Sequence, residues 1–199
     1  MIHRANNSIT IAFVLAVVLT TAISGLSDDS NAVLKSGPSI GSEVSSFYVR
    51  AVTGPLAGKS VCYVCRNGDR PVVMVFLREL GADTTRLLKR LDKTVNEHRA
   101  DGLRCFVVLL SESAQKDAAR LQTLAFDEKL DLPLTLAGES MAGANLTNVA
   151  PSAAVTVVLY DHLKVVERFS YRTGECDDTA CQSVIVAAES LAWKLTHRV

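Results

Sequence analysis

The chain has 199 residues, and its 21 lysines and arginines balance its 21 aspartates and glutamates, so the formal net charge is zero. No basic run is interleaved with aromatic residues, and this pattern argues against a nucleic-acid partner. The length suits one domain that can bury a sizeable hydrophobic core.

The first 25 residues have the pattern of a secretory leader. Arg4 lies in a short polar start, residues 9–23 are apolar or small, and Ala22-Ile23-Ser24 places small residues where a signal peptidase reads them. We predict a signal peptide or a membrane anchor over residues 1–25, because the apolar stretch is also long enough to span a bilayer. Both interpretations predict export: a protein that is periplasmic, secreted or anchored facing outside the cytoplasm.

The mature chain begins with residues 26–45, which are rich in Ser, Gly and Asp and are predicted to form a polar tether. The composition from residue 46 to residue 199 is that of a single folded domain. Residues 47–52 alternate loosely between apolar and polar side chains, as a strand does.

An Asn-Gly pair predicts a β-hairpin near the start of the domain. Asn67-Gly68 separates residues 60–66, which are rich in β-forming side chains, from residues 71–77. This arrangement is a strong short-range hairpin signal. The second run is apolar throughout, which favours a strand buried on both faces of a sheet.

The rest of the chain alternates between helical and strand patterns. The periodicity predicts helices over residues 83–99, 113–129 and 178–197, and strands over residues 103–110, 132–136, 154–160 and 164–171. The strands that flank the first helix should be parallel through a right-handed crossover, and the last two should pair antiparallel. We therefore predict an α/β domain with a mixed sheet covered by helices.

Three apolar segments follow one another in a recognisable order. Residues 71–76 form the expected central strand, residues 132–136 follow the second helix, and residues 155–161 end in a turn. This order resembles the thioredoxin-like superfamily, and most closely its redoxin branch of peroxiredoxins and alkyl hydroperoxide reductase-like proteins. The resemblance implies a three-layer α/β/α fold with a mixed central sheet and an N-terminal β-hairpin, over about residues 40–197.

The usual reactive cysteines of that superfamily have no counterpart here. In thioredoxins a Cys-x-x-Cys opens the helix after the central strand, where the helix N-terminus stabilises the thiolate. The matching place holds Gly81-Ala82-Asp83-Thr84, and the peroxiredoxin position is also without cysteine. The cis-proline of the family would fall near Val155, and its arginine at Ala154. The resemblance therefore implies the fold without its usual active site.

Cys62 and Cys65 have the spacing of a redox motif, elsewhere in the sequence. They could be a catalytic dithiol, a structural disulfide, or, with Cys105 as a third ligand, part of a metal site. In a regular strand they would point to opposite faces, so a bond between them requires a bulge or a turn. We see no helix start after either cysteine in the sequence pattern.

The remaining cysteines are interpreted as structural. Cys176 and Cys181 flank the start of the last helix and are predicted to form a disulfide that pins the preceding loop. In the thioredoxin layout this loop lies at the opposite pole from Cys62, so the two pairs should not exchange. Cys105 is expected to be a packed free thiol in a buried strand.

Two functional hypotheses follow. The first is an exported thiol-disulfide oxidoreductase that uses Cys62 and Cys65 on a thiol- or disulfide-containing protein partner. The second is a non-catalytic binding or scaffold protein of the cell envelope, with the same fold and structural disulfides. We predict no cofactor in either case, no resident metal as the first choice, and membrane contact only if the leader is not cleaved.

Overall fold

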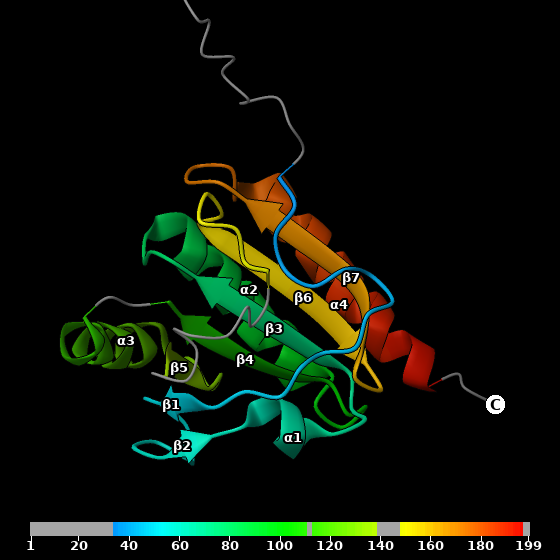
Figure 1. Cartoon of the computed structure of the whole chain (residues 1–199), viewed down its shortest axis with the longest axis horizontal. Coiled ribbons are helices and arrows are strands. Elements are labelled where there is room, and N and C mark those ends of the chain that lie inside the picture. The colour runs from blue at the N-terminus through cyan, green and yellow to red at the C-terminus, as the bar shows by residue number, and fades with distance from the viewer. Residues whose placement is uncertain (1–33, 111–112, 139–147, 197–199) are drawn as a thin grey trace, which may run out of the picture. The chain divides into compact units, whose positions relative to one another are not determined.

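The structure is a computed structural model, and it describes residues 34–110, 113–138 and 148–196 (Figure 1). The elements are β1 (Val49–Ala51), β2 (Ser60–Val61), α1 (Tyr63–Asn67), β3 (Val72–Leu77), α2 (Ala82–Glu97), β4 (Arg104–Leu109), α3 (Ala114–Glu128), β5 (Leu134–Ala137), β6 (Val155–Asp161), β7 (Lys164–Tyr171) and α4 (Asp178–Thr196). The predicted leader, residues 1–25, lies outside the described residues. Within them, no helix has the length and apolar character needed to cross a membrane.

The strands form one mixed seven-stranded sheet in the order β2-β1-β5-β4-β3-β6-β7. Strand β3 lies inside the sheet between β4, to which it is parallel, and β6, to which it is antiparallel. All six residues of β3 are buried, as expected for an apolar strand covered on both faces. The predicted parallel crossover and the antiparallel pairing of β6 with β7 are both confirmed.

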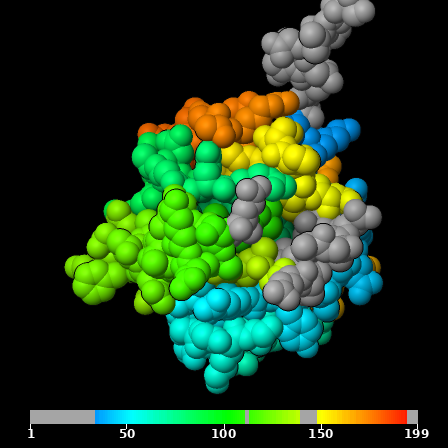
Figure 2. All heavy atoms as spheres, turned by 60° about the vertical axis from the view of Figure 1, so that its left-hand side comes forward, coloured from blue at the N-terminus to red at the C-terminus, as the bar shows by residue number. Residues whose placement is uncertain are grey.

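Helices α2 and α4 pack on one face of the sheet (Figure 1). The predicted apolar stripe of α2 is buried there, from Leu87 through Leu91 to Val95. Helix α3 adds Leu121 to the same hydrophobic cluster and lies beside β5. Figure 2, turned toward the β2 edge of the sheet, shows α3 and the β1–β2 segment at the surface on that side.

The opposite face is covered by α1 and by the chain that leads into β1. Its core is aromatic: the Phe47 ring lies 6.1 Å from the Phe76 ring and 6.2 Å from the Phe106 ring. Tyr63, the first residue of α1, stacks on Phe106 with 5.2 Å between ring centroids. Burying these rings provides the main driving force that holds the short helix on the sheet.

The predicted hairpin between residues 60–66 and 71–77 is wrong. Strand β2 ends at Val61 and pairs with β1, so the N-terminal hairpin consists of β1 and β2. The Asn-Gly pair ends α1 instead: Gly68 adopts a positive φ of 55° and donates its N–H to the carbonyl of Val64. Glycine tolerates this conformation at a helix C-terminus as readily as in a hairpin turn, so the dipeptide alone is ambiguous.

Part of the predicted tether is packed against the domain. The hydroxyl of the fully buried Ser36 lies 2.6 Å from the Thr156 hydroxyl, and Val44 is buried as well. Glu43 forms an isolated bridge with Lys164 of β7. Within the described residues, contacts with the domain therefore extend to Ser36, ahead of the boundary predicted at residue 46.

Candidate functional site

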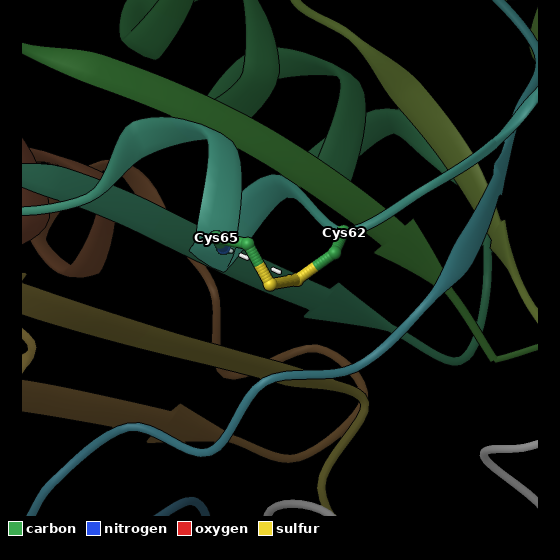
Figure 3. The surroundings of a disulfide bond; sticks show 2 residues. All are labelled: Cys62 and Cys65. Atoms are coloured by element: carbon green, nitrogen blue, oxygen red, sulfur yellow. Dashed lines mark hydrogen bonds between the residues drawn. A yellow bond between two sulfur atoms is a disulfide. The ribbon is translucent and has the colours of Figure 1, made fainter.

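Cys62 and Cys65 form a disulfide across the first turn of α1 (Figure 3). Cys62 is the N-cap residue with extended backbone angles, and its sulfur accepts a hydrogen bond from the backbone N–H of Cys65 at 3.1 Å. The expectation that no helix starts here is wrong, and the helical turn supplies the geometry that a regular strand could not. The local signal was the spacing itself, since residues three apart lie on one face of a helix.

The two cysteines differ in exposure. Cys62 is 7% exposed, whereas Cys65 belongs to the exposed class. The two residues between them, Tyr63 and Val64, are buried in the aromatic core. Buried neighbours thus fix the position of the disulfide, and Cys65 is its solvent-exposed end.

The first turn of α2, where the resemblance would place a reactive cysteine, is a polar cap. Gly81 precedes the helix, and its N–H donates to the Thr84 hydroxyl at 2.9 Å. Asp83 forms an ion pair with Arg86. Val155 pairs with Leu77 at the start of β6, and the described residues contain no cis peptide bond.

Cys176 and Cys181 lie close together as thiols. Their sulfurs are 3.9 Å apart, so the predicted disulfide is not formed in this structure and stays a prediction. Burial raises the pKa of Cys176 to about 12 and also raises that of Cys181. An ion pair between Arg86 and Asp178 ties the start of α4 to α2 nearby. Two buried thiols with raised pKa values are poor nucleophiles.

The two cysteine pairs lie at opposite ends of the sheet. Helix α1 leads into the start of β3, whereas Cys176 follows the end of β7. Strand β7 runs in the same direction as β3, because both are antiparallel to β6. The predicted placement of the two pairs at opposite ends is therefore correct. The sequence pattern did not indicate that Cys176 and Cys181 lie near the first turn of α2, where Arg86 pairs with Asp178.

Cys105 is buried in β4 as a free thiol. Burial and, to a lesser extent, the Asp92 carboxylate raise its pKa. Among the residues that the structure describes, no group of three His, Cys, Asp or Glu side chains is placed to hold a metal ion. The geometry therefore does not support the alternative in which Cys62, Cys65 and Cys105 share a metal.

A thiol count should reproduce this assignment. In the native protein, Cys105, Cys176 and Cys181 are expected to react slowly with a thiol reagent at pH 7, because burial keeps them protonated. After denaturation without reductant, Cys62 and Cys65 should stay unreactive and these three should react. Loss of the Cys176 and Cys181 signals would show that this pair had oxidised.

No family model and no curated protein sequence matches the chain. Solved structures do match it. A protein from Bacteroides thetaiotaomicron assigned as a protein disulfide isomerase has a TM-score of 0.62 at 14% identity, covering 82% of this chain and 98% of its own. The reduced 2-Cys peroxiredoxin of Plasmodium vivax has a TM-score of 0.59 at 14% identity, covering 80% and 86%.

A thiol:disulfide interchange protein from a Bacteroides species has a TM-score of 0.54 at 16% identity, covering 73% of this chain and 88% of its own. At these identities the likeness concerns the arrangement of the elements rather than the chemistry. It agrees with the mixed sheet and with helices α2 and α4 on one of its faces. The chain therefore has a thioredoxin-like fold.

Proposed function

We propose that this protein is an exported thiol-disulfide oxidoreductase that works through Cys62 and Cys65. The observation that carries the proposal is the Cys62–Cys65 disulfide across a helical turn, with Cys65 exposed and Cys62 buried. Exchange needs one sulfur that a partner can reach and a second that can release the partner. A partner protein with a thiol or a disulfide is the proposed substrate.

The exchange proceeds in two balanced steps. In the reducing direction, the Cys65 thiolate attacks a substrate disulfide, forms a mixed disulfide and releases one substrate thiolate. The Cys62 thiolate then attacks the Cys65 sulfur and releases the second substrate thiolate. Two electrons pass from the dithiol to the substrate, and the Cys62–Cys65 bond closes. In the oxidising direction, the same steps run in reverse.

The local structure supports the second step. The backbone N–H of Cys65 donates to the Cys62 sulfur at 3.1 Å, and such a bond favours sulfur as a thiolate when the pair is reduced. Because Tyr63 and Val64 are buried, the turn that brings the two sulfurs together is held by the core. The buried Cys62 thiol thus stays within reach of the Cys65 sulfur.

A non-catalytic scaffold role is the alternative, and one observation favours it. The first turn of α2 holds Thr84 and Asp83 where thioredoxins place their reactive cysteine, so the site is displaced from its usual position on the fold. In that case the Cys62–Cys65 bond fixes the first turn of α1 and serves stability alone.

The reduction potential of the Cys62–Cys65 pair separates the two functions. A value between about −120 and −270 mV, the range of known oxidoreductases, is expected for a redox-active pair, whereas a structural bond lies below about −300 mV. The Cys62→Ser/Cys65→Ser double variant should lose insulin reduction with dithiothreitol as the electron source. A Cys105→Ala variant, which leaves the pair intact, should keep it.

Export is proposed on the leader pattern of residues 1–25 and fits a chain that holds a disulfide. Fractionation of cells that express the full chain tests it. The protein should be found outside the cytoplasm, and N-terminal sequencing would then show whether the chain begins after Ser24.

A further inference from the structure

A cavity of about 450 Å³ lies on the side of α1 that faces the start of β4. Its lining includes four arginines, one tyrosine and one acidic residue: Arg66, Arg70, Arg99, Arg104, Tyr63 and Asp131. Asn67, Cys105 and several leucine, valine and proline residues complete its wall. The volume falls in the range of small-molecule sites, roughly 300–1,000 Å³.

Four arginines and one acidic residue, Asp131, line this cavity, so positive charge is concentrated there. Within residues 34–110, 113–138 and 148–196, no ion pair involves any of the four arginines, although eight others are formed. Burial, together with the nearby charges of Arg70 and Arg99, lowers the pKa of Arg104. Like charges brought this close repel one another unless an anion lies between them.

A buried polar group at the same cavity also lacks a partner. Tyr63 is 6% exposed, and its hydroxyl has no hydrogen-bond partner among the described residues. Burial raises its pKa, with Arg66 acting in the opposite direction. An unpaired buried hydroxyl costs free energy, and an acceptor atom brought against it would offset that cost.

Hydrogen bonds within the protein hold the walls of the cavity in place. The buried Asp92 carboxylate accepts the backbone N–H groups of Asp131 and Leu132 at 2.8 and 2.9 Å, which holds the chain before β5 in place. Arg104 donates to the carbonyls of Arg99 and Leu103. A preformed wall reduces the ordering that a ligand must induce on binding.

We propose that this cavity binds a small organic anion through a carboxylate or phosphate group held by the arginines, with its apolar part against the leucine and proline wall. Guanidinium forks match both oxyanions in a bidentate geometry. Asp131 offsets one of the four positive charges and is held by the Asn96 amide at 3.2 Å. The site is separate from the proposed redox chemistry, since it needs neither sulfur of the disulfide.

The test uses the oxidised mature protein with inorganic phosphate and with succinate as probes, each titrated calorimetrically at constant ionic strength set by chloride. At least one probe is expected to bind with a Kd of about 1 mM or below. The Arg70→Ala/Arg99→Ala variant should bind it at least tenfold more weakly. Both arginines are exposed, so this variant is expected to fold.

Arg50→Ala is the matched control, because Arg50 is exposed on β1 and does not line the cavity. It should bind the probe as the unchanged protein does. Relative affinities distinguish the source of the oxyanion: tighter succinate binding indicates a carboxylate ligand, and tighter phosphate binding indicates a phosphate ligand. The proposal is overturned if neither probe shows binding at a concentration of about 10 mM, tenfold above the expected Kd. It is also overturned if the cavity variant and Arg50→Ala bind the probe with equal affinity.

Discussion

Cys65→Ser is expected to abolish thiol-disulfide exchange completely, whereas Cys62→Ser should leave a protein that forms mixed disulfides and cannot release them. The reason is the difference in exposure: Cys65 is open to the solvent, and Cys62 is 7% exposed. An incoming disulfide can reach only the outer sulfur, and the inner sulfur is needed to displace the product. In this assignment the second cysteine of the motif, Cys65, attacks the substrate, and the first, Cys62, releases it.

The measurement is a trapping experiment with a disulfide-bonded substrate protein, followed by non-reducing electrophoresis. Cys62→Ser should give a covalent adduct that reductant dissolves, and Cys65→Ser should give none. Neither substitution removes Cys105, Cys176 or Cys181, so the Cys62→Ser/Cys65→Ser double variant, which keeps all three, serves as the control for adducts through other thiols. An adduct on Cys65→Ser would show that Cys62 is the attacking residue and would refute the assignment of roles.

Raising the pH from 7.5 to 9.5 is expected to lower the free energy of unfolding by about 3 kcal/mol through Cys105 and Cys176 alone. Burial raises the pKa of both thiols in the folded protein, to about 12 for Cys176. Unfolded cysteine ionises near pH 8.5, so above that pH the unfolded state loses protons that the folded state keeps. The stabilisation is fully present below pH 8.5 and is lost as the pH rises.

Urea unfolding at the two pH values, in deaerated buffer, measures this loss. The Cys105→Ala/Cys176→Ala variant is less stable at pH 7.5 because of the atoms removed, and its stability should also depend less on pH. If the pH dependence of the variant equalled that of the unchanged protein, the buried thiols would not be its source. A disulfide between Cys176 and Cys181 would remove the contribution of that pair.

Much of the fold was readable from periodicity. The stripe of Leu87, Leu91 and Val95 is the buried face of α2, and the apolar run at residues 72–77 is the fully buried strand β3. Helical spacing predicts the first segment, and a short apolar run rich in β-branched residues predicts the second. The absence of cysteine from residues 81–84 was likewise visible directly in the sequence.

The candidate site was harder to predict, because its signals are short. Residues 60–66 are rich in β-forming side chains, yet they divide into β2 and α1, since stacking Tyr63 on Phe106 outweighs the weak local preference for a strand. The Asn-Gly pair suits either a hairpin or a helix end, and only the partners of β3 decide between them. Local propensities of a few tenths of a kcal/mol give way to the burial of an aromatic ring.

By itself, the sequence determined the order of the main helices and strands, the mixed sheet and the lack of sulfur at the start of α2. Only the tertiary structure decided that Cys62 and Cys65 are joined across a helical turn, and that Arg66, Arg70, Arg99 and Arg104 surround one cavity. Periodic apolar patterns act within one element, where the chain itself sets the spacing. Contacts between α1, α2 and β4 depend on how separate elements pack, and no local pattern encodes that.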